Sequence, residues 1–234
     1  MRCVRIGSVV AATFAATLTL TTQSLAQPNA AVEPPAIADH ELVVERIGIG
    51  FAGVSEVPFP NGAIAAPVIS ARYWMSSEMG LEIGLGLATA GGSVETDNGA
   101  ASDTVDKNGA FAVMVHGGLP LALHNAEHYS FQIIPELNFG MAQQEISVDG
   151  GDNIENSGRR IDAGVRAGAE IHFGFIGAPE LTLTGSVGLF YTNQQTKTEQ
   201  GNASRIDTTT GLATTSFNNP WDFFTSHVAA RYYF

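Results

Sequence analysis

The stretch IDAGVRAGAEIHF, residues 161–173, alternates between two kinds of side chain. Its odd-numbered positions are all apolar, and its even-numbered positions hold Asp162, Gly164, Arg166, Gly168, Glu170 and His172. Successive side chains of a β-strand point to opposite faces of the sheet, so this pattern predicts a strand with one apolar and one polar face. The fold then depends on which of these two faces lies inside.

The same period of two recurs in residues 46–52, 69–75, 81–88, 111–121, 129–142, 181–191 and 223–234. After residue 26 no stretch shows the 3.6-residue period of a helix. Most of these stretches approach the 9–11 residues that a tilted strand needs to cross a bilayer, although the first two are shorter. Short connections alternate with long polar loops. This arrangement predicts an all-β fold, an eight-stranded antiparallel up-and-down transmembrane β-barrel over residues 42–234, with both of its ends on the short-turn side.

Charged residues indicate which face lies inside. In each stretch the large apolar residues define one face, and every charged residue lies on the other: Arg46, Arg72, Glu82, Glu136, Asp162, Arg166, Glu170 and Arg231. A charge that faces lipid at mid-membrane costs about 2–4 kcal/mol. A soluble barrel has the opposite arrangement, with its apolar face inside. We therefore predict that the apolar face meets lipid and the polar face lines the lumen.

These eight charged residues comprise four arginines and four acids, so the predicted lumen is electrically balanced. Balanced charges in a narrow interior should pair with one another, and Glu136 and Arg166 fall at mid-height on adjacent strands. We predict a lumen ion-pair network and a structural or surface-interaction role. The alternative is a narrow porin-like channel for small or apolar solutes, because inward glycines such as Gly84 and Gly188 leave space for water.

The first 26 residues have the features of a cleaved secretory signal: two arginines, an alanine-rich apolar run and Ser24-Leu25-Ala26 before the cleavage point. Residues 27–40, rich in proline and alanine, predict a periplasmic tether over residues 27–41. The single cysteine, Cys3, lies in the signal, so disulfides are not expected. The net charge is −12, and Lys107 and Lys197 are the only lysines, which argues against a nucleic-acid partner.

Four segments resemble the small outer-membrane β-barrel proteins of Gram-negative bacteria: RYW (72–74) before a tight turn, IPELNFG (134–140), AGAEIHFG (167–174) and HVAARYYF (227–234). The resemblance covers about residues 42–234. It implies a location in the cell outer membrane, contact with outer-membrane lipid, and Tyr232 and Phe234 as a C-terminal signal read by the barrel-assembly machinery. It implies little chemistry.

Several motifs have the residue spacing of enzyme sites, but the predicted strands and turns place their residues in the wrong geometry for those sites. GIGFAG, residues 48–53, has the spacing of a dinucleotide-binding turn, but the prolines and turn residues after it prevent the helix that such a site needs. His124 to His128 match H-x-x-E-H, but they fall in a short turn rather than on a helix. Ser226 and His227 are neighbours on opposite faces, and His128 with Ser130 lacks an assigned acid. We predict no catalytic residue and no cofactor.

The predicted long loops are acidic. Asp149, Asp152 and Glu155 could bind calcium weakly, but they lack the ligand spacing of an EF-hand, so no metal site is predicted. The loops are expected to keep the cell surface hydrophilic and to offer a site for an extracellular ligand.

Aromatic residues and prolines complete the expectations for the barrel. Aromatic residues near the strand ends, including Trp74 and Tyr233 on the short-turn side, predict the girdles of a membrane barrel. Pro120 and Pro135 interrupt two predicted strands, and proline cannot donate a ladder hydrogen bond. A bulge near Pro135, or a place for Pro120 at the membrane edge, is therefore expected.

Overall fold

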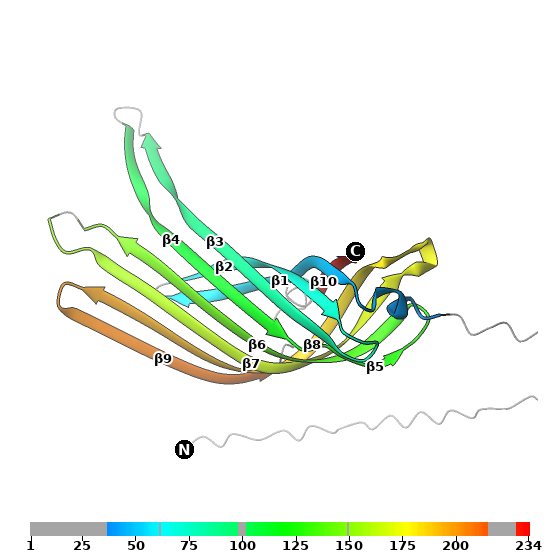
Figure 1. Cartoon of the computed structure of the whole chain (residues 1–234). Coiled ribbons are helices and arrows are strands. Elements are labelled where there is room, and N and C mark those ends of the chain that lie inside the picture. Colours follow the sequence, from blue (N-terminus) through cyan, green and yellow to red (C-terminus); the bar gives the residue numbers. More distant parts are fainter. Residues whose placement is uncertain (1–36, 61, 98–101, 149, 215–227) are drawn as a thin grey trace, which may run out of the picture. The chain divides into compact units, whose positions relative to one another are not determined.

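The computed structural model describes residues 37–60, 62–97, 102–148, 150–214 and 228–234 (Figure 1). The predicted signal sequence and most of the predicted tether lie outside these ranges, as do Asp149, Ser226 and His227. No helix in the described ranges is long and apolar enough to cross a membrane.

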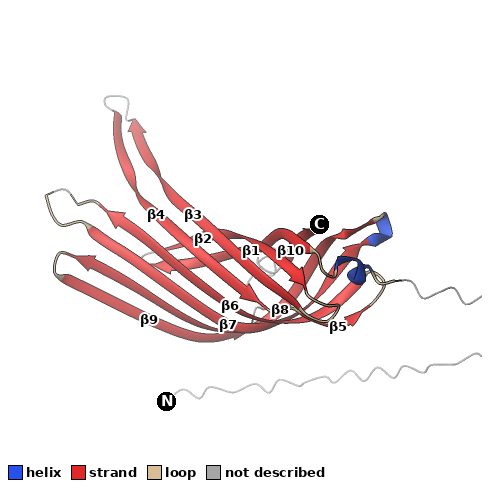
Figure 2. Ribbon diagram, viewed as in Figure 1, coloured by secondary structure: helices blue, strands red, loops and turns tan. Residues whose placement is uncertain are grey.

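The described residues form strands almost throughout (Figure 2). In chain order the strands are β1 (Ile47–Phe59), β2 (Gly62–Trp74), β3 (Gly80–Asp97), β4 (Ser102–Gly118), β5 (Leu121–Asn125), β6 (Tyr129–Ile146), β7 (Ile154–Phe173), β8 (Ala178–Gln200), β9 (Ala203–Thr214) and β10 (Val228–Tyr233). A short 3-10 helix, η1 (Asp39–Val43), precedes β1, and another, η2 (Gly174–Ile176), joins β7 to β8.

The strands close into a ring of antiparallel neighbours in the order β1, β2, β3, β4, β6, β7, β8 and β10. The last strand closes it, because Arg231 pairs with Gly50 of β1 on one side and with Thr182 of β8 on the other. β5 prolongs β4 along β6, and β9 pairs with the far half of β8. The predicted eight-stranded up-and-down barrel is confirmed.

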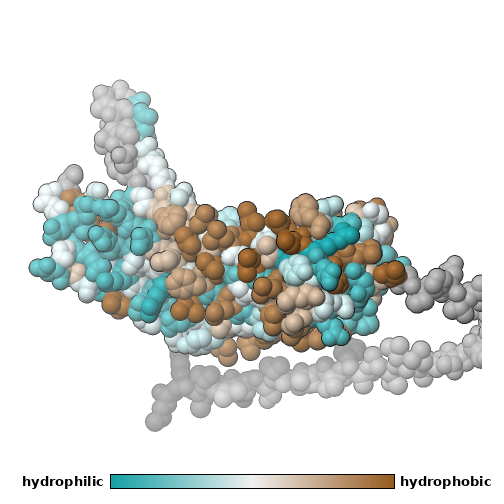
Figure 3. All heavy atoms as spheres, viewed as in Figure 1, coloured by the Kyte–Doolittle hydropathy of each residue, from teal (hydrophilic) through white to brown (hydrophobic). Residues whose placement is uncertain are grey.

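The two faces of each strand differ as the alternation predicts. Ile83 is 60 % exposed on the outside, while its neighbour Glu82 is fully buried inside the barrel. Large apolar residues are exposed on the outside of the strands, including Ile49, Ile69, Leu85, Val115, Leu137, Val165, Val187 and Tyr232. On the face shown in Figure 3, hydrophobic residues gather in a band. A barrel with an apolar outside and a charged inside is suited to lipid rather than water.

In their described residues, three of the predicted long loops are paired strands that continue beyond the ring, which corrects the sequence analysis. β3 and β4 stay paired to Asp97↔Ser102, β6 and β7 to Ile146↔Ile154, and β8 and β9 to Gln200↔Ala203. The sequence of these extensions is mainly polar, and on the face shown in Figure 3 hydrophilic residues project beyond the apolar band. The ladder continues outside the membrane because backbone pairing needs no apolar side chain. We call the two ends of the barrel the hairpin end and the short-turn end.

The fourth predicted loop, VSEVPFPNGAIAAP, is also a hairpin, formed by β1 and β2, and it leans into the barrel. A register shift between Phe51 and Gly53 bends β1, and Gly53 has φ = 117°, a conformation that glycine adopts readily. Beyond the bend, the Arg160 Nη1 group of β7 donates a hydrogen bond to the Glu56 carbonyl at 3.1 Å. A Cβ atom at Gly158 of β7 would collide with the Pro58 carbonyl, so β1 reaches across to the opposite wall.

The two strand prolines lie together where β4 ends and β5 begins. The Leu119 N–H donates to the Pro135 carbonyl at 2.9 Å, and the Pro120 carbonyl accepts from Gly80 N–H at 2.8 Å. The ladder between β6 and β7 runs through Pro135↔Val165 with no register shift, so the bulge expected at Pro135 is absent. None is needed, because the proline nitrogen faces the interruption between β4 and β5.

Candidate functional site

The lumen is the candidate site because it collects the charged side chains of the barrel. Near the short-turn end, Glu82 of β3 lies between two arginines. Its Oε2 atom accepts a hydrogen bond from Arg72 Nε at 2.9 Å, and its Oε1 atom pairs with Arg231. None of these three side chains is more than 2 % exposed. Each arginine therefore has a carboxylate partner in the buried interior of the barrel.

Glu170 of β7 completes this group. Its Oε2 atom accepts hydrogen bonds from Arg72 Nη1 at 3.1 Å and from Gln132 Nε2 at 2.6 Å. Its Oε1 atom accepts from the Thr182 hydroxyl at 2.8 Å and from the Tyr233 hydroxyl at 3.1 Å. We call Arg72, Glu82, Gln132, Glu170 and Arg231 the charge network. Its two arginines balance its two carboxylates.

At mid-height Glu136 of β6 pairs with Arg166 of β7. The same carboxylate accepts a hydrogen bond from Asn138 Nδ2 at 3.2 Å, and Arg166 Nη1 donates to the Ser186 hydroxyl at 3.3 Å. These bonds hold the arginine against the inner wall formed by the neighbouring strands β6, β7 and β8.

The other two predicted charges lie elsewhere, so the eight residues do not form one network. Arg46 is 42 % exposed in its side chain and pairs with Glu180 at 3.4 Å at the edge of the barrel. Asp162 pairs with Arg160 at 2.8 Å and accepts a hydrogen bond from Thr192 at 2.7 Å. The sequence analysis missed Arg160 and Glu180 because each lies one residue outside a predicted strand.

An apolar cluster fills the lumen towards the hairpin end. Its buried members are Val57, Ile64, Ala66, Val68, Ala110, Ala112, Met114 and Ala142. β1 and β2 contribute half of them, through the hairpin that leans inward. The cluster and the charge network therefore obstruct the lumen at two levels.

The inward glycines do not leave an open path. A Cβ atom at Gly84 would lie 2.9 Å from Val68 Cγ1, and one at Gly188 would lie 2.6 Å from Arg166 Cγ. A Cβ atom at Gly48 would meet the ring of Tyr233 at 2.7 Å. The space that these glycines leave is occupied by large neighbouring side chains, which removes the argument for a channel that the sequence offered.

Trp74 and Tyr233 form the floor of the lumen instead of the predicted aromatic girdle. Both are fully buried, and the Trp74 Nε1–H donates to the Tyr233 hydroxyl at 3.0 Å. His40 of η1 packs edge-on against Trp74 with ring centroids 4.4 Å apart. His40 and its neighbour Asp39, both placed in the tether by the sequence analysis, are therefore part of the barrel interior. Burial lowers the pKa of His40 to about 4.

Of the residues that suggested an enzyme, His128 and Ser130 lie in the described part of the chain and do not form a nucleophile–base pair, whereas Ser226 and His227 lie outside it. His128 has an acidic partner that the sequence analysis did not assign: its Nδ1 atom lies 2.8 Å from Asp39 Oδ2. Its Nε2 atom lies 3.7 Å from Glu127, while the Ser130 hydroxyl accepts a hydrogen bond from Gln132 at 3.5 Å. His124 is exposed in β5, so H-x-x-E-H here belongs to a strand and turn.

A groove of about 610 Å³ opens among the hairpins. Amide and acidic side chains line much of it, including Gln144, Glu145, Glu155, Asn156 and Glu199. Asn156 bridges two strands, donating to Gln144 at 3.2 Å and accepting from Thr198 at 3.1 Å.

No protein-family model and no curated protein matches the chain. Among solved structures, it is similar to Ail, the attachment invasion locus protein of Yersinia pestis, with 12 % identity and a TM-score of 0.33 over 81 % of this chain and 97 % of that one. It is also similar to a major outer membrane protein from Thermus thermophilus, with 14 % identity and a TM-score of 0.36 over 81 % of this chain and 98 % of that one. Similarity at these scores supports no transfer of function.

Proposed function

We propose that the chain is an exported outer-membrane barrel, closed to solutes, that displays polar hairpins outside the cell and serves envelope structure or surface interactions. The observation that carries this proposal is the double obstruction of the lumen. The apolar cluster occupies one level and the charge network another, while the polar strand extensions project beyond the apolar band (Figure 3). A conduit would need both levels to open.

The last strand supports assembly in the outer membrane. Tyr232 and Phe234 point outward, are 45 % and 71 % exposed, and pack with ring centroids 5.1 Å apart. Two adjacent aromatic side chains on the lipid face suit recognition by the barrel-assembly machinery. The groove among the hairpins is the surface that we propose for an extracellular ligand.

Cysteine labelling tests the membrane orientation, because the only native cysteine, Cys3, lies in the predicted signal. Thr208→Cys places a thiol on the exposed face of β9, and Glu78→Cys places one in the exposed turn between β2 and β3. With a membrane-impermeant maleimide, intact cells should label Thr208→Cys, whereas Glu78→Cys should react only after the outer membrane is permeabilised. A heat-dependent shift on SDS gels would show that each variant is folded.

Labelling of Glu78→Cys on intact cells would reverse the proposed orientation. A soluble periplasmic protein with no heat-dependent shift would refute the membrane location.

A further inference from the structure

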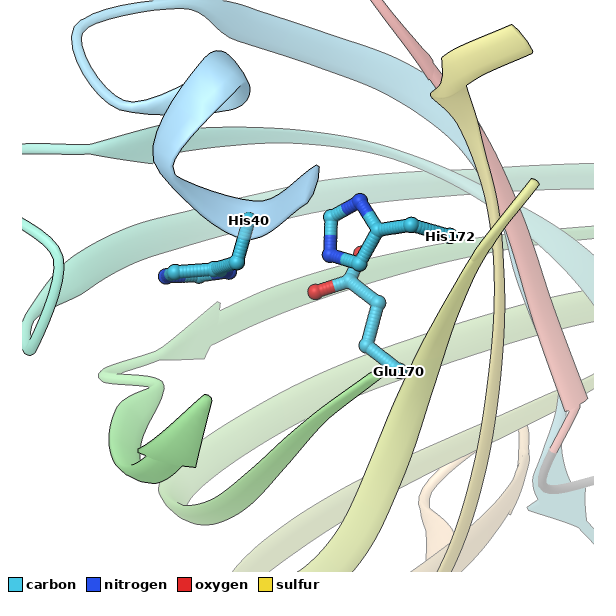
Figure 4. Close-up of side chains that lie close together, drawn as sticks. All are labelled: His40, Glu170 and His172. Atoms are coloured by element: carbon cyan, nitrogen blue, oxygen red, sulfur yellow. The ribbon is translucent and has the colours of Figure 1, made fainter. Parts of the chain in front are cut away.

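Three buried side chains meet beside the floor of the lumen (Figure 4). Glu170 and His172 are two residues apart on β7 and share its inward face, whereas His40 comes from η1, before the barrel begins. One possible ligand atom from each residue lies within 4.8 Å of the other two. All three residues are fully buried. The cluster thus joins a segment outside the ring of strands to the inner wall.

Each imidazole has one nitrogen on a backbone carbonyl and one nitrogen without a partner. His40 Nε2 lies 3.1 Å from the Ser77 carbonyl, and His172 Nδ1 lies 3.1 Å from the Pro179 carbonyl. A carbonyl only accepts, so these nitrogens carry the protons and donate. His40 Nδ1 and His172 Nε2 keep lone pairs and, though buried, have no hydrogen-bond partner. Buried polar atoms normally have one.

This arrangement is typical of histidines that bind metal ions. A metal-binding imidazole usually donates its other N–H to a carbonyl or carboxylate, which fixes the ring orientation and the tautomer. Both rings meet this condition from independent parts of the chain.

Glu170 can supply the third ligand without breaking its ion pair. Arg72 and Gln132 hold its Oε2 atom, whereas Oε1 accepts only from the hydroxyls of Thr182 and Tyr233. A hydroxyl hydrogen rotates to suit its surroundings, and a hydroxyl oxygen can also accept. A cation could therefore take the place of one of these two hydroxyl hydrogens at Oε1 while Oε2 stays with Arg72.

We propose that His40, Glu170 and His172 bind one divalent transition-metal ion, zinc by its ligand preference, which fastens η1 to β7 at the short-turn end. Two imidazoles and a carboxylate suit zinc, whereas calcium and magnesium prefer oxygen ligands alone. Water would take the fourth position of a tetrahedral site. The ion would give His40 Nδ1 and His172 Nε2 a partner, and it would hold the segment before the barrel against the lumen floor.

Metal titration of the full chain, purified in detergent and stripped with a chelator, tests this site. Calorimetry with zinc chloride should show one ion per folded chain, and the cobalt form should show the visible absorption of a tetrahedral site. His40→Ala and His172→Ala should each weaken zinc binding by more than the 10–100-fold typical of losing an outer-shell partner. His124→Ala, at an exposed histidine of the same end, is the matched control and should bind as the native chain does.

Heat-dependent gel mobility shows whether each variant is folded. His40 lies outside the strands, so His40→Ala tests the site even if His172→Ala fails to fold. Zinc should raise the unfolding temperature of the native chain and of His124→Ala but not that of His40→Ala, while magnesium should have no effect. The proposal fails if the native chain binds no zinc, if His40→Ala binds it equally well, or if only His124→Ala loses binding.

Discussion

Arg231 of the last strand and Glu82 of the third strand form a buried ion pair, although 149 residues separate them in the sequence. Glu82 also pairs with Arg72 of β2, its cross-strand neighbour. One carboxylate therefore connects β2 and β3 to β10, the strand that closes the ring. The closure of the barrel is stabilised from inside as well as by backbone pairing.

Replacing Glu82 with glutamine should strongly destabilise the barrel. The substitution keeps the shape of the side chain but leaves Arg231 without a carboxylate and Arg72 with Glu170 alone. Removing one partner of a buried ion pair typically costs about 3–5 kcal/mol, because the remaining charge is uncompensated. Urea titration of the protein refolded in lipid vesicles measures the free energy of unfolding.

Asp207→Asn is the matched control for Glu82→Gln, because Asp207 pairs with Arg205 on the exposed part of β9. A surface pair contributes about 0–1 kcal/mol, so this variant should unfold almost as the native chain does. Equal stability of the two variants would show that the charge network does not hold the barrel closed.

The apolar cluster should behave as a packed core. Met114 is 1 % exposed inside the lumen, so Met114→Ala should lower the free energy of unfolding by about 2–5 kcal/mol through lost burial and the cavity left behind. Met141, on the neighbouring strand, is 44 % exposed on the outer face. Met141→Ala should cost less, because lipid fills the space that the side chain leaves. A smaller loss for Met114→Ala than for Met141→Ala would contradict a packed lumen.

Stability of the metal-free barrel should fall between pH 6.5 and about 4 because of His40. Burial lowers its pKa from 6.5 in the unfolded chain to about 4, so over this window the unfolded state binds the additional proton. Stability therefore rises with pH there, by up to about 3 kcal/mol from this residue alone. Glu170 opposes this shift of the His40 pKa, while His172 and Arg72 reinforce it.

This contribution can be isolated by comparing the native chain with His40→Gln. The free energy of unfolding of each, after treatment with a chelator, is measured across that pH window. The native chain should lose more stability than His40→Gln as the pH falls. Parallel curves would mean that His40 is accessible to protons in the folded barrel.

The period of two was enough to predict the ring of eight strands and the orientation of its faces. Residues 161–173 illustrate why: within a membrane, one misplaced charge is costly, so the pattern along a strand is strict. Outside the apolar band that constraint disappears. The polar part of β8 and all of β9 therefore had the composition of loops, although backbone pairing makes them strands.

The interior was harder to predict because contacts across the lumen have no sequence period. Trp74 and Tyr233 lie next to outward aromatic residues and were assigned to a girdle, but their parity, which matches Arg72 and Arg231, places them inside. His40 follows a proline-rich segment, and nothing in that composition indicates that η1 returns to the barrel. The bend at Gly53 likewise could not be predicted without the register of the partner strand, because a glycine alone does not specify a bulge.

Electrical recording across a planar lipid bilayer tests the closed lumen most directly. The native full chain should give no conductance steps once heat-dependent gel mobility has verified its insertion. Glu136→Ala should give none either, because the apolar cluster still fills the lumen between Glu136 and the hairpin end. Steady, voltage-independent conductance of the native chain would contradict a lumen closed by the apolar cluster and the charge network.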